Sequence, residues 1–216
     1  MKFYLLFLQL VFLFAFQNST LADGDPAKGK SVYITCAACH GPNGEGIQAT
    51  NSPRLSGQRG SYLVSQLQKF RSGLRGASPE DVYGAQMAPM AKILPDEQSL
   101  LDVAAYISTL QASRPTRTEI SGDPVLGKKE YKYCARCHGP KGMGYDSPEV
   151  TTKKSHHGPR LSGQHDWYLI RQIQNFRARI RGNSEDKAAT YMQNDVQSLF
   201  NDQLIRDVVA YIGTLE

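Results

Sequence analysis

The sequence predicts an all-α chain made of two tandem, homologous domains. Two observations carry this prediction: apolar residues recur at helical spacing, and most of the chain occurs twice at an offset of about 100 residues. The chain has 216 residues, of which 40% are hydrophobic and 21% charged. This composition excludes disordered, collagenous and polytopic membrane chains. The repeat is domain-sized, since solenoid repeats span roughly 20 to 50 residues.

The first 22 residues have the pattern of a secretory signal peptide. Lys2 precedes an apolar run over residues 3–16, and a short polar stretch then ends in Ala22. Those 14 residues are short for a membrane span, which needs about 20. We therefore expect cleavage after Ala22 and export. The alternative is an N-terminal anchor that is not cleaved.

The repeat sets the domain boundaries. Residues 33–46 recur as residues 131–144, with nine of fourteen positions identical, and residues 96–110 recur as residues 201–215. The second copy holds eight additional residues within positions 145–157. The expected organisation is a first domain over residues 23–112, a linker over residues 113–121 and a second domain over residues 122–216.

Each copy carries the apolar stripes of three main helices, separated by long polar loops. The stripes of the middle and last helices of the first copy are Leu63, Leu67, Phe70 and Leu74, and Leu100, Val103, Ala104, Ile107 and Leu110. The second copy repeats both stripes. The expected N-caps are Asp25 and Asp123, each followed by proline, and Asp96 and Asn201.

A glycine lies inside the first helix of each copy, at Gly29 and Gly127. Glycine costs about 1 kcal/mol relative to alanine in a helix interior, so a matched pair needs a reason. We predict that the first and last helices of each copy cross at this glycine. The tyrosine pairs expected at the crossings are Tyr33 with Tyr106 and Tyr131 with Tyr211.

The motif C-x-x-C-H occurs at residues 36–40 and again at residues 134–138. Cysteines three apart on a helical turn point the same way, so both thiols can reach the two vinyl groups of one porphyrin. The adjacent histidine then lies beneath the iron. We therefore expect two covalently bound haem c groups. The attachment residues would be Cys36, Cys39, Cys134 and Cys137.

Three other uses of paired cysteines explain the sequence less well. A zinc site would place both pairs on one metal, but they belong to separate copies, and each has a histidine that a four-cysteine site does not need. A thioredoxin-like pair needs a βαβ context, which is absent from the sequence. Local disulfides suit an exported chain, but they explain neither the histidines nor the long loops without an apolar core.

The repeat also selects a second axial ligand for each iron. Met87 and Met192 each precede the matched tyrosine of the last helix by 19 residues. Met90 aligns with Asp195, so it is an alternative for the first haem only, and core packing is the alternative role of any methionine. A thioether ligand raises the reduction potential relative to a second histidine. The expected axial pairs are His40 with Met87 and His138 with Met192.

Several other side chains are expected to support the haem ligands or to lie at the surface. A ligating histidine usually donates its second ring N–H to a carbonyl or carboxylate. Pro53 and Pro159 are matched candidates for supplying the carbonyl, and the alternative is that they only shape the loop. We expect the His156–His157 pair of the inserted segment on a solvated surface. His165, before the second-copy helix, is expected to pack or to lie at a haem edge.

In these motifs the sequence resembles the cytochrome c4 family. Members of that family consist of two class I cytochrome c domains, and each domain holds an iron ligated by histidine and methionine. The resemblance rests on both C-x-x-C-H motifs, on the PRLSGQ segments beginning at Pro53 and Pro159, and on the MAPM segment beginning at Met87. It implies a periplasmic carrier between a quinol-oxidising cytochrome complex and a terminal haem-copper oxidase. The second ligand segment, residues 191–195, departs from the MAPM pattern.

Two further functions stay open: a dihaem electron-transfer subunit of a flavocytochrome dehydrogenase, and a dihaem enzyme with an open iron site. Matched methionines argue against the enzyme. The net charge of +5 is not gathered into basic runs, so we expect no nucleic-acid partner. Residues 113–216 hold 16 basic and 12 acidic side chains, a net +4 that would orient the molecule at redox partners. We expect a monomer in peripheral contact with membrane complexes.

Overall fold

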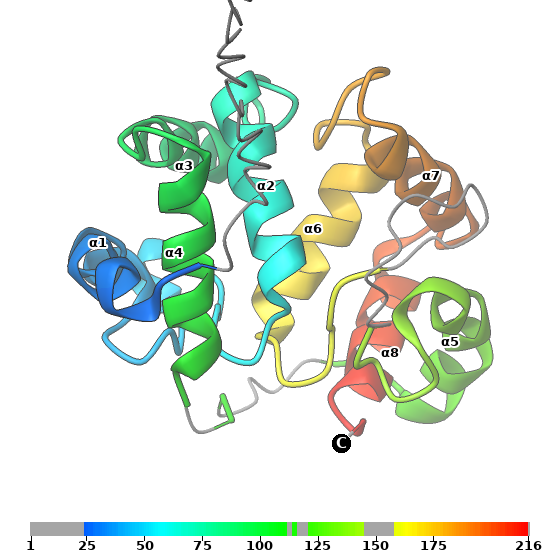
Figure 1. Ribbon diagram of the computed structural model, residues 1–216. Coiled ribbons are helices and arrows are strands. Elements are labelled where there is room, and N and C mark those ends of the chain that lie inside the picture. Colours follow the sequence, from blue (N-terminus) through cyan, green and yellow to red (C-terminus); the bar gives the residue numbers. More distant parts are fainter. Residues whose placement is uncertain (1–23, 112–113, 116–120, 145–157, 216) are drawn as a thin grey trace, which may run out of the picture.

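A computed structural model of the chain describes residues 24–111, 114–115, 121–144 and 158–215. Within these residues the regular structure is entirely helical, which confirms the all-α prediction (Figure 1). The expected signal peptide, most of the expected linker and the His156–His157 pair lie outside the described residues. None of the described helices is both long and apolar enough to cross a membrane.

The described residues form two equivalent sets of four α-helices. The first set is α1 (Pro26–His40), α2 (Gly60–Ser72), α3 (Val82–Lys92) and α4 (Glu97–Thr109), with the 3₁₀ helix η1 (Gln48–Thr50) after α1. The second set is α5 (Pro124–His138), α6 (Asp166–Arg177), α7 (Lys187–Asp195) and α8 (Asp202–Ile212), with the 3₁₀ helix η2 (Val196–Ser198) before α8. The repeat in the sequence is thus a repeat in the fold.

Short polar side chains begin the helices where the sequence predicts them. The Asp25 carboxylate accepts hydrogen bonds from the first backbone N–H groups of α1, and Asp123 does the same for α5. Asp96 and Asn201 cap α4 and α8. These side chains satisfy donors that the first turn of a helix leaves unpaired.

The prediction of three main helices per domain was wrong, because α3 and α7 add a fourth. Asp81 and Asp186 cap them equivalently, each accepting a backbone N–H three residues on. The signal for α3 is weak because Pro89 lies inside it, and proline removes a helical hydrogen bond. The two methionines expected as ligands therefore lie within helices and not in loops that precede one.

The first and last helices of each domain cross as predicted. A Cβ atom on Gly29 would overlap the carbonyl oxygen of Asp102 in α4, and one on Gly127 would overlap that of Asp207 in α8. The ring centroids lie 5.3 Å apart in the pair Tyr33–Tyr106 and 5.2 Å apart in the pair Tyr131–Tyr211. Glycine is required at both crossings because two helix backbones touch there.

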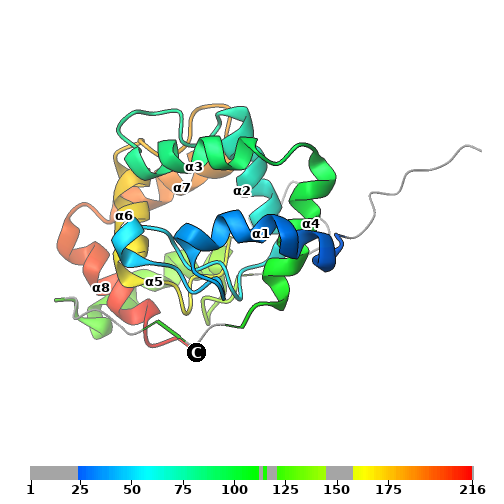
Figure 2. The ribbon, with the colours of Figure 1, turned by 90° about the vertical axis from the view of Figure 1, so that its left-hand side faces the viewer.

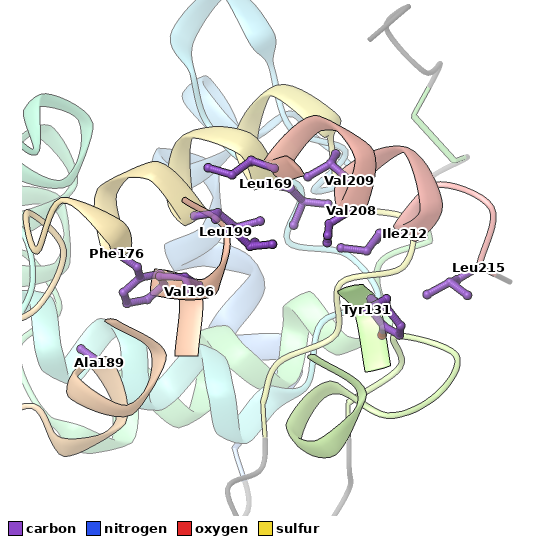
Figure 3. Close-up of a cluster of buried hydrophobic side chains, with 12 residues drawn as sticks. Tyr131, Leu169, Phe176, Ala189, Val196, Leu199, Val208, Val209, Ile212 and Leu215 are labelled. Atoms are coloured by element: carbon purple, nitrogen blue, oxygen red, sulfur yellow. The ribbon is translucent and has the colours of Figure 1, made fainter. Parts of the chain in front are cut away.

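The apolar core of each domain packs between the crossing helices and the second helix. In the second domain, the cluster combines fully buried residues of α8 with residues of α6 and of the η2 segment (Figure 3). Its members include Leu169, Phe176, Val196, Leu199, Ile205, Val208 and Val209. Cys134 and Met192 pack against this cluster, so the attachment motif lies at the border of the core.

The two domains meet through α2 and α6, which lie at the centre of the molecule (Figure 1). Arg75 and Arg181 are buried there, each 8% exposed. The amide oxygens of Gln66 and Gln172 each accept from both guanidinium groups, over 2.6–3.3 Å. Each guanidinium also lies over a phenylalanine ring of its own domain. The buried charges are therefore held by shared polar contacts and by ring faces.

A second set of contacts ties the loops that precede α2 and α6. The side chain of Gln58 bonds to the backbone N–H and carbonyl of Arg160, both at 3.0 Å. The side chain of Gln164 bonds to the same groups of Arg54, at 2.9 and 3.0 Å. Because equivalent residues exchange contacts, the interface has approximate two-fold symmetry.

Alanine at Gly127 tests the helix crossing. Gly127→Ala is expected to lower the free energy of unfolding of the chain by about 1–3 kcal/mol, because an added methyl group cannot fit against a helix backbone. Urea unfolding followed by circular dichroism measures the loss. Gly60→Ala is the matched control, since a Cβ atom there lies 3.5 Å from Ser108 Oγ in ordinary contact. Equal stability of the two variants would contradict the crossing argument.

Candidate functional site

Both C-x-x-C-H motifs occupy the last turn of a helix. Cys36, Cys39 and His40 end α1, and the equivalent residues 134, 137 and 138 end α5. The next residue in each copy, Gly41 or Gly139, has a positive φ, of 82° and 77°. Glycine adopts this conformation without steric cost. The chain can therefore leave the helix sharply and fold back beneath the histidine.

The two histidines are held in the same way. His40 and His138 are each 6% exposed. The Nδ1 atom of His40 lies 2.8 Å from the carbonyl oxygen of Pro53, and that of His138 lies 2.8 Å from the carbonyl oxygen of Pro159. A carbonyl only accepts, so Nδ1 carries the proton in both rings. The expected proline carbonyl contacts are confirmed.

Burial keeps both imidazoles neutral. It lowers the pKa of His40 and of His138 below the usual range, while the hydrogen bond to the proline carbonyl acts in the opposite direction. A neutral ring with its proton on Nδ1 presents the lone pair of Nε2. That lone pair is what an iron centre binds.

The tyrosines of the helix crossings support the same turn. Tyr33 donates its hydroxyl proton to the carbonyl of Gly41, over 2.8 Å, and Tyr131 donates to Gly139 in the same way. The carbonyl of His40 accepts the N–H of Gly46, at 2.8 Å. The crossing of α1 with α4 is thereby connected to the position of the histidine.

Gly158 closes the loop beneath the second histidine. Its N–H donates to the carbonyl of Cys137, over 2.8 Å. A Cβ atom at this position would lie 2.5 Å from Nδ1 of His138. Glycine therefore lets this loop pass directly against the ring. In the first domain Ser52 holds the equivalent position, and its N–H donates to the carbonyl of Ile47 instead, over 3.1 Å.

All four cysteines are free thiols in the structure. Burial raises the pKa of Cys36, and raises that of Cys134 to about 12. Reactive and catalytic thiols have a lowered pKa instead, so a thioredoxin-like pair is not supported. Across the described residues, no three His, Cys, Asp or Glu side chains are grouped as a metal-ion site, so a zinc site is not supported either.

The methionines expected as ligands occupy equivalent places. Met87 in α3 and Met192 in α7 are each the sixth residue of their helix, and both are partly buried. Met90 is 37% exposed. Its counterpart Asp195 forms a salt bridge of 3.6 Å with Arg136. The register that pairs Met87 with Met192 is therefore also the register of the two helices.

Two contacts between the domains were not predicted from the sequence. Arg59, which precedes α2, donates to the carbonyl of Gly158 in the second domain, over 2.6 Å. His165, its counterpart before α6, lies with Nε2 2.8 Å from the carbonyl of Glu45 in the first domain. The expectation that His165 packs is met, but it packs across the interface. Equivalent spacing of Arg59 and His165 from the PRLSGQ segments was the available signal.

The donor set fits a haem in each domain. Each helix end supplies two free thiols and a neutral imidazole oriented through Nδ1, and the same domain supplies a thioether from α3 or α7. This is the combination of sulfur and nitrogen donors that c-type haem uses.

Comparison with known proteins agrees with this geometry. A family model described as Cytochrome c matches residues 26–111 and again residues 125–216. Cytochrome c4 of Azotobacter vinelandii is 35% identical over 203 residues, covering 90% of each chain. The crystal structure of reduced recombinant cytochrome c4 from Pseudomonas stutzeri matches with a TM-score of 0.68 at 32% identity, over 89% of this chain and 100% of that one.

A protein with a different described role is also similar. The thiosulfate dehydrogenase electron acceptor of Stutzerimonas stutzeri (strain A1501) is 28% identical, over 88% of this chain and 87% of its own length. The cytochrome c4 proteins match at higher identity and over slightly more of this chain. The chain therefore belongs to the cytochrome c4 family of electron carriers and has two covalently bound haem c groups.

Proposed function

We propose specific residues for haem attachment and iron ligation. Thioether bonds form at Cys36 and Cys39 in the first domain and at Cys134 and Cys137 in the second. The axial ligands are His40 with Met87 and His138 with Met192. The matched register of the methionines in α3 and α7, together with the two buried imidazoles, supports this assignment.

The haem supplies a centre that gains or loses one electron. The chain holds the ligands so that they move little when this happens. The hydrogen bond from Nδ1 to the proline carbonyl prevents the imidazole from rotating, and the tyrosine bond to the next carbonyl fixes the helix end. A thioether from Met87 or Met192 would occupy an iron position that water could otherwise take. This arrangement suits a carrier and not an enzyme, which needs an open position.

We place this carrier in the periplasm, between a quinol-oxidising cytochrome complex and a terminal oxidase. The assignment uses residues 1–22 as a cleaved signal peptide, residues 23–112 and 122–216 as the two haem domains, and residues 113–121 as a linker. The chain acts as a monomer that touches membrane complexes peripherally. The cytochrome c4 relatives support the electron-carrier part of this proposal.

A second candidate role has specific support. The relative described as a thiosulfate dehydrogenase electron acceptor covers most of this chain. In this second role, the electron donor is an enzyme of sulfur oxidation in place of the quinol-oxidising complex. Reduction of the oxidised chain by purified quinol-oxidising complex, compared with reduction by a thiosulfate dehydrogenase, separates the two roles. Faster reduction by the dehydrogenase would favour the second.

Haem attachment can be tested by mass. The exported chain is expected to weigh two haem groups more than its polypeptide, and Cys134→Ala with Cys137→Ala is expected to retain one, because the first domain has its own pair of thiols. Intact-protein mass spectrometry measures both. A wild-type chain with one haem or none would refute the assignment.

The proposed methionine ligands can be tested by removing one of them. Met192→Ala is expected to let carbon monoxide bind one of the two reduced haems, because the thioether no longer fills the position. Optical titration with carbon monoxide gives the fraction of haem that binds. Met90→Ala is the control and is expected to leave both haems closed. Binding to the wild-type chain would instead favour an enzyme.

A further inference from the structure

Each domain reaches across the interface onto the loop that orients the other domain's histidine. Arg59 directly precedes α2, and its Nη2 donates to the carbonyl of Gly158, over 2.6 Å. His165 directly precedes α6, and its Nε2 lies 2.8 Å from the carbonyl of Glu45. Arg59 and His165 hold equivalent positions, but their carbonyl partners do not, because Gly158 corresponds to Ser52 and Glu45 corresponds to Met143. A guanidinium is always protonated.

Gly158 lies immediately against the second histidine. Its Cα faces the ring of His138, as the short distance of a hypothetical Cβ to Nδ1 indicates. The carbonyl of the following residue, Pro159, accepts the hydrogen bond from Nδ1–H, and the N–H of Gly158 donates to the carbonyl of Cys137. The Arg59 guanidinium is therefore bonded one peptide away from the hydrogen bond that orients the ring.

Arg59 therefore places a cation on the second histidine loop. Its Nη2 bonds to the carbonyl of Gly158, the residue that lies against the His138 ring and directly precedes Pro159. On the first histidine loop, the contact from the neighbouring domain is made by an imidazole and goes to Glu45. The two loops thus receive different side chains from the neighbouring domain, and the guanidinium is bonded next to the ring.

We propose that Arg59, a residue of the first domain, is a positioning residue that raises the reduction potential of the haem in the second domain. A fixed cation near the imidazole disfavours the ferric state, which carries one more positive charge than the ferrous state. The guanidinium also polarises the peptide group next to the Pro159 carbonyl, and this weakens that carbonyl as a hydrogen-bond acceptor for Nδ1–H. The imidazole would then donate less charge to the iron. This inference rests on the ligands proposed above.

Arg59→Gln tests the inference in the full, haem-loaded chain. Spectroelectrochemical titration gives two potentials, and the wave that changes in Met192→Ala belongs to the second domain. We expect Arg59→Gln to lower the ferrous-to-ferric ratio of that haem at least threefold at a fixed potential, or about 28 mV at 59 mV per tenfold change. The potential of the first haem is expected to shift less than half as much.

Two further variants separate charge from structure. Arg59→Lys keeps the cation and is expected to restore at least half of the shift. Arg206→Gln removes the same charge near the start of α8, where the side chain bonds to Gln203, and is expected to move neither potential. A variant with lower thermal stability but an unchanged second potential, or equal shifts of both haems, would overturn the inference. Carbon monoxide binding to a reduced haem of the wild-type chain would overturn the proposed ligands instead.

Discussion

The hydrogen bond from a buried imidazole to a proline carbonyl is the contact on which each domain depends. It fixes the tautomer and the direction of His40 and His138, and the rest of the fold brings its two partners together. The crossing of the first and last helices places a tyrosine whose hydroxyl holds the turn after the histidine. Glycine at the crossing lets the helices approach closely enough for this. The same residues therefore pack the helices together and orient the histidine.

The interface between the domains fixes the two histidine sites relative to each other. Buried arginines share glutamine oxygens, and loop glutamines bond to backbone groups of the opposite domain. Polar groups that are buried and satisfied specify one arrangement, because any slippage would leave some of them unpaired. The two histidine loops are thus held in a fixed relation by side chains and not by the connecting segment alone.

Much of the fold and of the candidate site could be predicted from the sequence, because the two copies of the repeat can be compared with each other. The repeat showed which cysteines, histidines, prolines and methionines are equivalent, and the matched glycines inside the first helices predicted the crossing at Gly29 and Gly127. The helices α3 and α7 escaped prediction, since Pro89 and mixed polarity hide their periodicity. The interface could not be predicted either. Arg75 and Arg181 look like surface residues in a linear pattern, and only their three-dimensional partners show that they are buried.

The exchanged contacts give one chain the interface pattern of a symmetric dimer. A surface in which Gln58 bonds to Arg160 while Gln164 bonds to Arg54 is complementary to itself. Self-complementary surfaces are what two identical chains need in order to pair. Two identical chains would have to carry the same residue at each equivalent position, whereas the joined copies need not. The equivalent positions 59 and 165 accordingly hold arginine and histidine, which bond to different backbone carbonyls.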